Sequence, residues 1–501
     1  MGEPGHRSQP ARLQDVPVTL GTRPAASPPV DLPARSDEFV RGISEAIGGP
    51  LGSHAVRGSG PGRFQHVARI VLAMICLVLA AHWLQKSPCQ NGAWSDLKQY
   101  RQMCYTDVLA LYYSEGLADG QIPYVQHAVE YPVLTGVFMG VLGLPVHALG
   151  KNHPEINQGQ WFYNANALVL SGFAVASAVF LLGLRRRRPW DVAMFALAPA
   201  LFVTATVNWD LLAVFFAVSG LYAWARRYPV LAGVLLGLGT AAKLWPGFLF
   251  IPLLLLGLRT RRFADAFAAS AAGVLTWALV NLPVMFGYGD SWRQFFHLNR
   301  TRAIDWGTLW YLGDHFPFVG QIRQFGWFDS HIDTLNILTY VLFGLCCVGV
   351  AVLVFVAPEP PRLAQLAFLV VAAFLIFSKV WSQQYVLWLL PLAVLARPRW
   401  GVFLAWQVAE VLYFCAFYGE LMAASGKPVF PETVFDLAAL FRLVMVTVFA
   451  GYVIRDVLRP ERDVVRTTYE GEDPDGGVFN DAAAFPYPDE EPQERRPALV
   501  T

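Results

Sequence analysis

The sequence has little charge and few cysteines. Only 15% of its 501 residues are charged, whereas 55% are hydrophobic, and the mean hydropathy is +0.40. A soluble globular protein carries about 25% charged residues, so this composition excludes that class. The formal net charge is +1. Because there is no basic surplus to neutralise phosphates, we do not expect nucleic acid as a partner.

The six cysteines are too few and too scattered for a disulfide framework, and no Cys-x-x-Cys pair points to a zinc site. Cys89 and Cys104 differ from the others because they flank the polar segment after the first apolar run. In an oxidising compartment they could form a disulfide, which would stabilise the fold by roughly 3 kcal/mol. The others fall in apolar runs and are interpreted as small core residues: Cys76, Cys346, Cys347 and Cys415.

Composition divides the chain into three regions. Residues 1–65 are rich in Pro, Gly, Ser and Arg and lack apolar periodicity, which predicts a disordered leader. The first apolar run begins near Val67, too late for a cleavable signal peptide. Residues 66–456 alternate apolar runs with polar turns, which predicts an all-α polytopic membrane domain of about 12–13 helices. Residues 457–501 are polar and acidic, and are expected to form a disordered tail.

Arginine clusters predict the orientation of the membrane domain. They recur after every second predicted span, as is typical of cytoplasmic loops. Both terminal regions are then expected in the cytoplasm, and the long segments around 85–160 and 287–331 outside it. The clusters are Arg185–Arg188, Arg226–Arg227, Arg259–Arg262, Arg362 and Arg397–Arg399.

Residues 132–150 do not fit this scheme. They are apolar enough to cross a membrane, but one crossing there would place Arg185–Arg188 outside. Pro145, the glycines and the polar stretch 151–160 allow a re-entrant or broken helical hairpin instead. An extra membrane crossing elsewhere would equally well return Arg185–Arg188 to the cytoplasmic side.

Asp107 is the candidate catalytic residue. It lies in Tyr105-Thr106-Asp107, in the first polar stretch after the first apolar helix. A carboxylate at the membrane surface can accept a proton from a hydroxyl without entering hydrocarbon, where an ionised group is costly. The alternative is that Asp107 only caps or anchors a helix.

The external loop 287–331 carries arginines, a histidine and tryptophans, including His297, Arg300, Arg302 and Trp306. Arginine forks match phosphate oxygens, and flat aromatic faces suit sugar rings, so the loop could hold a sugar phosphate. The alternative is an interfacial aromatic belt with arginines at lipid headgroups.

Two lysines lie between apolar spans. Lys243 and Lys379 are each placed at a predicted external turn. A lysine there is costly unless it snorkels or pairs, so contact with an anionic ligand and snorkelling both remain open. Asp210, at a third turn, could pair with either lysine or face an acceptor sugar.

At these residues the sequence resembles glycosyltransferase family 87, whose members have the GT-C architecture and include polyprenyl-phosphate-mannose-dependent α-mannosyltransferases of actinobacterial cell envelopes. The resemblance covers most of residues 67–456. It is carried by Asp107-Val-Leu-Ala-Leu-Tyr112-Tyr113, Pro123-Tyr124, Tyr131-Pro132, Lys243-Leu-Trp-Pro246 and Ser382-Gln-Gln-Tyr385. The Cys89–Cys104 stretch before Asp107 is long for that pattern.

The resemblance implies a GT-C-type helical bundle in the cytoplasmic membrane with its site on the outer face. It implies an inverting hexosyltransferase that needs neither metal nor cofactor. The sugar, mannose by this resemblance, would move from a polyprenyl-phosphate donor to a glycolipid or glycan acceptor of the envelope. Asp107 would be the general base. The donor phosphate would bind Lys243, Arg300, Arg302 and Lys379, and the sugars would contact Tyr112, Tyr124, Asp210, His297 and Trp306.

A different class remains open. Many spans, intramembrane lysines and helix-breaking prolines are also typical of a transporter or flippase for a lipid-linked or anionic substrate. The absence of a clear internal repeat and the long external loops favour an enzyme that works on one face. A non-catalytic scaffold would leave the polar external turns unexplained.

Overall fold

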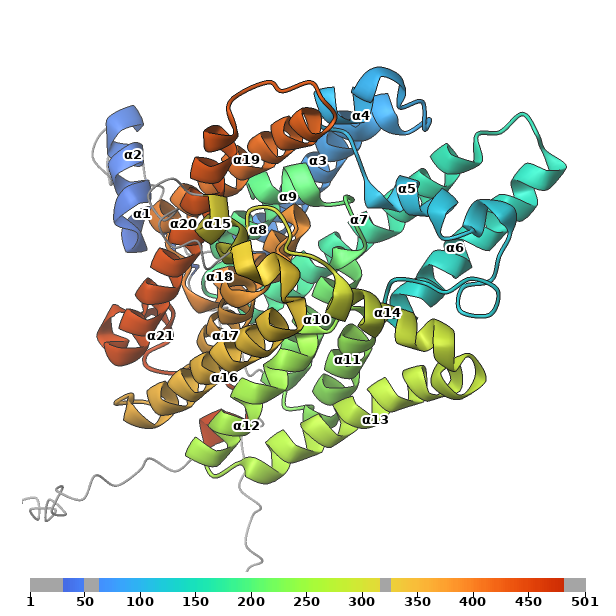
Figure 1. Cartoon of the computed structure of the whole chain (residues 1–501). Helices are drawn as coiled ribbons and strands as arrows, with labels where there is room; N and C mark the ends of the chain where they lie inside the picture. Colours follow the sequence, from blue (N-terminus) through green and yellow to red (C-terminus); the bar gives the residue numbers. More distant parts are fainter. Residues whose placement is uncertain (1–29, 49–62, 316–325, 482–501) are drawn as a thin grey trace, which may run out of the picture.

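The computed structural model describes residues 30–48, 63–315 and 326–481. These residues form helices and connecting loops, and no β-strand occurs among them (Figure 1). The predicted all-α class is therefore confirmed.

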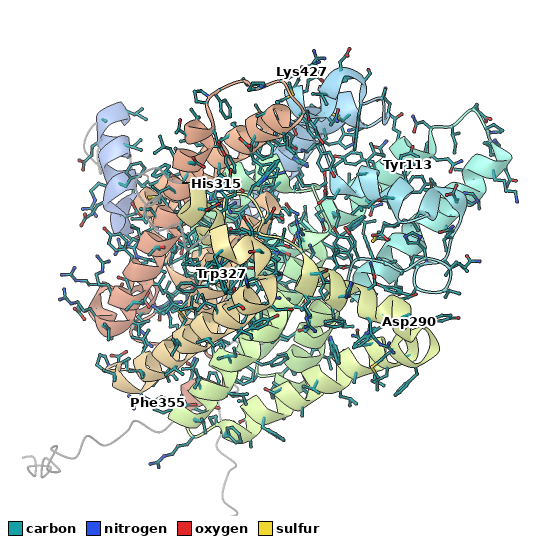
Figure 2. The ribbon with its side chains drawn as sticks, viewed as in Figure 1. Tyr113, Asp290, His315, Trp327, Phe355 and Lys427 are labelled. Carbon is teal, nitrogen blue, oxygen red and sulfur yellow. A yellow bond between two sulfur atoms is a disulfide. The ribbon has the colours of Figure 1, made fainter. Side chains whose placement is uncertain are left out.

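Within the described residues, seven helices are long and apolar enough to cross a membrane. At 1.5 Å per residue, a helix of 24 residues spans about 36 Å, more than the hydrocarbon core of a bilayer. Their outward side chains are apolar; Phe355, for example, is 50% exposed and lies at the edge of the bundle (Figure 2). The chain is thus a multi-pass membrane protein. The seven are α3 (Arg63–Lys86), α6 (Val133–Asn152), α7 (Gln158–Leu184), α13 (Phe263–Gly287), α16 (Ile332–Val356), α19 (Trp400–Ala424) and α20 (Glu432–Leu458).

The part of the chain that the structure describes also contains six shorter apolar segments, which lie among these long helices. α17 and α18 are buried along most of their length, because they are enclosed by other helices rather than by lipid. Segments of 10–17 residues are too short for a straight crossing of roughly 20 residues. One end of each lies at a buried polar turn, for example at Asn208, Lys243 or Ser378, which is tolerated where the turn is enclosed by protein. The segments are 189–204, α10 (Asp210–Ala225), α11 (Pro229–Ala242), η5 with α12 (Trp245–Leu249 and Phe250–Arg259), α17 (Leu363–Phe377) and η7 with α18 (Gln383–Tyr385 and Val386–Ala396).

One face of the bundle, called here the arginine face, collects the arginines at the ends of α7 and α18 and the start of α17. Arg185 forms an ion pair with Asp475 at 2.7 Å, and Arg362 forms one with Asp463 at 2.6 Å. Both guanidinium groups also donate to the carbonyl oxygen of Leu395, near the C-terminus of α18. The predicted basic loops therefore meet on one side.

The expectation of a disordered tail from 457 onward is wrong for residues 457–481. This segment contains η8 (Pro460–Arg462), α21 (Val464–Thr468) and η9 (Gly477–Asp481), and it covers the arginine face. Its acidic side chains are ordered because they neutralise buried arginines far away in the sequence. Residues 482–501 lie outside the described residues.

Part of the leader is also folded against this face. α1 (Pro33–Ser36) and α2 (Glu38–Gly48) follow Asp31, which pairs with Arg188 at 2.7 Å. Asp37 accepts from the backbone N–H of Trp400 at the start of α19. The remaining leader residues, 1–29 and 49–62, lie outside the described residues.

The segment 132–150 forms one unbroken helix, α6, and Pro145 does not interrupt it. Both ends of α6 nevertheless lie on the side opposite to the arginine face. Its N-terminus follows Tyr131, which lines the cavity described below, and Asn157 beyond its C-terminus donates to the carbonyl of Asn91 after α3. α6 and the first half of α7 therefore form a hairpin on that side, and only α7 continues to the arginine face. With both ends of α6 on one side, Arg185–Arg188 lie on the same side as the other arginines although α6 is not broken.

Candidate active site

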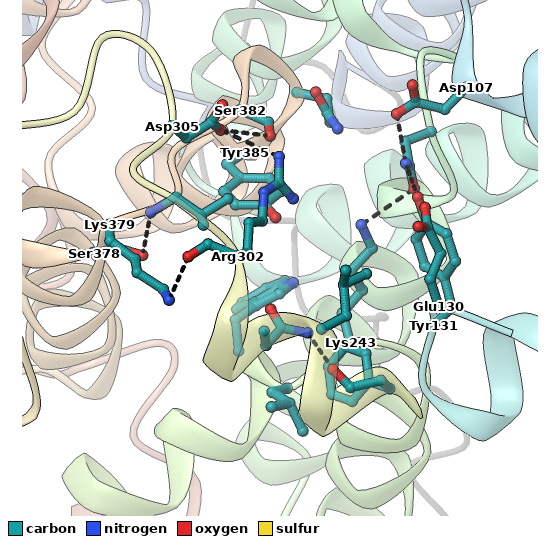
Figure 3. Close-up of a pocket in the computed structure, with 18 of the residues that line it drawn as sticks. Asp107, Glu130, Tyr131, Lys243, Arg302, Asp305, Ser378, Lys379, Ser382 and Tyr385 are labelled. Carbon is teal, nitrogen blue, oxygen red and sulfur yellow. Dashed lines mark hydrogen bonds and ion pairs between the residues drawn. The ribbon is translucent and has the colours of Figure 1, made fainter. Parts of the chain in front are cut away.

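A cavity of about 660 Å³ opens at the end of the bundle opposite to the arginine face (Figure 3). It is lined by the segments before α5 (Asp107–Ser114) and α6, the start of α10, the end of α11, α14 (Gly289–Thr301) and the turn between α17 and η7. A volume of this size suits a small-molecule substrate.

Two groups of largely apolar residues line the cavity. The first, called here the apolar lobe, comes from η5, α14, α16 and α17 and consists of Phe248, Phe295, Phe296, Tyr340 and Phe374. Phe296 and Tyr340 are 39% and 68% exposed, so this lobe reaches the outer surface of α14 and α16. The second group, called here the aromatic lobe, consists of Tyr100, Tyr105, Phe417 and Leu421.

Asp107, the first residue of α5, also lines the cavity. Thr106, not Asp107, is the N-cap of this helix, because its hydroxyl accepts from the N–H of Val108. The Thr106 hydroxyl also donates to the carbonyl of Thr206, and the Asp107 N–H donates to that of Val207. The Asp107 carboxylate is therefore not used as a cap and faces the cavity.

Asn208 holds this carboxylate through its side-chain amide. The Nδ2 group donates to Asp107 Oδ2 at 2.8 Å and to the Tyr131 hydroxyl at 2.6 Å. The Oδ1 atom accepts from Lys243 Nζ at 3.2 Å and from the Trp209 N–H at 2.7 Å. Asn208 itself is 2% exposed, so one fixed amide connects the carboxylate with the ammonium group (Figure 3).

The pKa of the Asp107 carboxyl is raised above its ordinary value, mainly by burial. Hydrogen bonds from Asn208 and Tyr105 and the charge of Lys243 act in the opposite direction and lower the pKa. A carboxylate with a raised pKa is a stronger base than an exposed one and suits proton abstraction.

Lys243 is the cation that Asn208 connects with this carboxylate. Its ammonium group forms an ion pair with Asp210 at 3.2 Å and lies over the rings of Tyr131 and Tyr385 at 5.4 and 5.6 Å. Asp210 is fully buried, accepts from Trp388 Nε1 and does not line the cavity. Of the two alternatives for Asp210, the structure therefore favours pairing with a lysine.

Arg302 lies on the cavity wall opposite to Asp107 (Figure 3). One guanidinium nitrogen of Arg302 is 3.7 Å from Oδ2 of Asp305. Lys379 Nζ donates to the backbone carbonyls of Arg300 and Arg302 at 3.0 and 2.7 Å, which ties the α17–η7 turn to the end of α14. Burial lowers the pKa of Lys379 to about 8. The Arg300 side chain pairs with exposed Asp333 at 3.0 Å. Arg302 is therefore placed better than Arg300 to reach an anion in the cavity.

Four other predicted contact residues do not line the cavity. Tyr112 is buried, stacks on Phe162 and donates to Gln158. Tyr124 is buried and donates to the carbonyl of Tyr131. His297 is exposed on α14, and Trp306 packs against Phe417.

The sequence interpretation did not single out several polar residues that line the cavity. Glu130 faces it beside Tyr131 (Figure 3), and burial and the neighbouring Asp107 raise the pKa of Glu130. Asn208 and Asp305 were likewise not assigned a role. Their positions in the sequence could have identified them, because each lies within three residues of a residue that was considered. These neighbours are Tyr131 for Glu130, Asp210 for Asn208 and Trp306 for Asp305.

A disulfide joins Cys89 and Cys104 and closes the segment between α3 and α5. Among the described residues, no group of three or more His, Cys, Asp or Glu side chains could hold a metal ion.

Comparison with known proteins identifies a family. Residues 131–379 match the model of glycosyltransferase family 87, and a search of the curated proteins found no match. The matched region contains Tyr131, Asn208, Lys243 and Arg302, whereas Asp107 precedes it. The resemblance predicted from the sequence is thereby confirmed: the chain belongs to glycosyltransferase family 87 and is a membrane glycosyltransferase.

Proposed function

We propose that the protein transfers a hexose, mannose by its family resemblance, from a polyprenyl monophosphate to a glycolipid or glycan of the cell envelope. The observation that carries this proposal is that a carboxylate, Asp107, shares one cavity with the cations Lys243 and Arg302 and with an apolar lobe open to the lipid-facing surface. A lipid-linked sugar phosphate has these three chemical parts: a sugar to be attacked, an anion and an apolar chain.

The donor chain would lie in the apolar lobe, where burying each CH₂ group contributes about 0.8 kcal/mol. Its phosphate would lie between Lys243 and Arg302, whose charges stabilise the negative charge that grows on the leaving oxygen. Both cations are already oriented by carboxylates, Asp210 and Asp305, so little rearrangement is needed on binding.

In the reaction, the acceptor hydroxyl oxygen attacks the anomeric carbon while the bond from that carbon to the phosphate oxygen breaks. The hydroxyl proton passes to Asp107, and the bonding electrons leave with the polyprenyl phosphate. Attack opposite to the leaving phosphate inverts the anomeric configuration. The arrangement of Asp107 on one wall and Arg302 on the other supports attack and departure from opposite sides (Figure 3).

The orientation belongs to the same proposal. The arginine face and the terminal segments 30–48 and 457–481 would be cytoplasmic by the positive-inside rule, and the cavity would face the outside of the cytoplasmic membrane. The disulfide between Cys89 and Cys104 supports this orientation, because disulfides persist in oxidising compartments.

The test is transfer by purified protein in nanodiscs from polyprenyl-phosphate-mannose to a panel of mannosides. Asp107→Asn keeps the shape of the side chain but removes the base, so we expect kcat to fall by about 10²–10⁴-fold while donor binding persists. Asp290→Asn, on the fully exposed side chain at the start of α14, is the matched control and should keep wild-type activity. Equal transfer by Asp107→Asn, or no transfer by the wild type from any polyprenyl-phosphate sugar, would refute the proposal.

A further inference from the structure

Two of the four residues of the aromatic lobe come from one segment, the disulfide-closed loop Cys89–Cys104 together with Tyr105. Tyr100 and Tyr105 both line the cavity, and their ring centroids are 6.1 Å apart. They pack with residues of α9 (Pro199–Thr204) and α19, in a hydrophobic cluster separate from that of Phe248 and Phe374 in the apolar lobe. The two lobes therefore rest on different parts of the core.

This loop is rigidly held. The disulfide closes it, and the buried ammonium group of Lys86 donates to the carbonyls of Met103 and Tyr105 at 3.3 and 3.1 Å. Met103 has a φ of 51°, a left-handed conformation that is costly for a residue with a long side chain and that these bonds stabilise. The Tyr418 hydroxyl fixes the carbonyl of Tyr105 from the side of α19.

The loop also reaches the catalytic group. Tyr105 lines the cavity together with Asp107 and lies two residues before it, and the Trp94 ring packs on that of Tyr105 with centroids 5.4 Å apart. A molecule that lies on the Tyr100 and Tyr105 rings is thus next to the base. The apolar lobe lies elsewhere on the cavity wall and is open to lipid.

We propose that the disulfide-closed loop 89–104 is the acceptor-binding element and that a neutral hexose ring of the acceptor packs against Tyr100 beside Asp107. This inference rests on the proposed glycosyl transfer. Partly buried tyrosines offer a flat apolar face and a polar hydroxyl, which together suit the mixed surface of a pyranose ring. The loop carries no carboxylate or cation into the cavity: among its residues and Tyr105, only Tyr100 and Tyr105 line it. This lining favours a neutral ligand over a phosphate.

The loop lies outside the region that matches the family, which covers residues 131–379. The phosphate-facing residues Lys243 and Arg302 lie inside that region. Donor binding and acceptor binding are therefore assigned to different parts of the chain, so substitutions should separate them kinetically.

The kinetic test compares two tyrosines that line opposite lobes, with polyprenyl-phosphate-mannose as donor and octyl α-mannoside as acceptor. Tyr100→Ala should raise the KM for the mannoside by about three- to tenfold and leave the donor KM unchanged, since stacking contacts are worth that much. Tyr340→Ala in the apolar lobe should raise the donor KM and spare the acceptor KM. Tyr100→Phe keeps the ring but removes the hydroxyl, so the KM for the mannoside should rise less than in Tyr100→Ala.

The disulfide supplies a second variant. Cys89→Ser with Cys104→Ser should raise the mannoside KM as Tyr100→Ala does, with the donor KM unchanged. A loss that affects both substrates equally in this variant and in Tyr100→Ala would show a merely structural role and overturn the inference. An unchanged mannoside KM in Tyr100→Ala would overturn it as well.

A binding measurement separates this inference from the proposed function. Saturation-transfer NMR with methyl α-mannoside and methyl α-glucoside is carried out on Asp107→Asn without donor, so no turnover is required. Signal for either hexoside that is lost in Asp107→Asn/Tyr100→Ala, but kept in Asp107→Asn/Tyr340→Ala, supports the acceptor site even if the donor has been misidentified. No signal for either hexoside, or a signal that persists without the Tyr100 ring, overturns it.

Discussion

Asn208 connects the carboxylate of Asp107 with the ammonium group of Lys243 through the two ends of one amide. Because Asn208 is buried, neither end can exchange its partner for water. At the scale of single residues, the orientation of the proposed base therefore depends on a side chain that has no acid–base chemistry of its own.

Asn208→Asp tests this dependence by replacing one donor group with an oxygen. The carboxylate at position 208 can still accept from Lys243, but it faces Asp107 with a like charge. We expect kcat to fall by about 10- to 100-fold, the value of a hydrogen bond to a charged group. Asn164→Asp, which changes an asparagine that accepts from Trp83 away from the cavity, is the control. Wild-type turnover in Asn208→Asp would contradict this role.

The pH dependence of the transfer activity should also depend on Asp107 and Asn208. Burial raises the pKa of Asp107, and the reaction needs the deprotonated form, so activity is present above that pKa and is lost as the pH falls through it. The acid limb of kcat/KM should therefore lie above the ordinary aspartate value of about 3.9. In Asn208→Asp the limb should move to still higher pH, and an unmoved limb would assign it to another group.

At the scale of helices, α17 and α18 are joined by the turn that lines the cavity, and their other two ends are held together on the arginine face. On the arginine face, Arg362 donates to Leu395 and Ala396 at the C-terminus of α18, where a helix end is negative. The same guanidinium group pairs with Asp463, and burial is almost complete for both partners. The tail thus stabilises the two helices that carry Lys379 at their other end.

Removing one partner of this pair should be costly, because the other charge stays buried without compensation. We expect Arg362→Met to lower the free energy of unfolding by about 3–5 kcal/mol and Arg362→Met/Asp463→Leu to lower it by less than the sum of the single changes. Thermal unfolding in nanodiscs measures both. Arg293→Gln, in a pair whose partners are 70% and 100% exposed, is the control and should change stability by at most about 1 kcal/mol. Strictly additive effects would argue against coupling of Arg362 with Asp463.

At the scale of the whole molecule, the bundle has two chemically different ends. One end carries buried arginines covered by the terminal segments, and the other carries the cavity and the disulfide-closed loop. Asp290 lies at the periphery of the cavity end (Figure 2), and Arg227 lies after α10 beside Asp481 of the tail.

This polarity predicts opposite accessibility of two single cysteines. In a background without Cys76, Cys346, Cys347 and Cys415, we expect Asp290→Cys to react with an impermeant maleimide in intact cells. Arg227→Cys should react only after lysis, because the arginine face is proposed to be cytoplasmic. Labelling of both positions from the same side would overturn the orientation.

The candidate site was predicted in part. Asp107, Lys243, Arg300, Arg302 and Lys379 all line the cavity, although their catalytic and binding roles stay predictions. The sequence could not distinguish Arg300 from Arg302: the last turn of α14 directs the first side chain to exposed Asp333, and the chain bends before the second. Such a difference depends on where a helix ends, which local sequence determines only within a few residues.

The family, the all-α class and the grouping of basic loops were accessible from the sequence because hydropathy and charge are properties of short segments, and lipid requires every apolar run to form a helix. Tertiary structure alone decided the course of α6, the burial of Asp210 and the folding of residues 457–481. Each of these depends on partners distant in the chain, such as Asp475 for Arg185, and no local pattern encodes which buried charge will be neutralised by which.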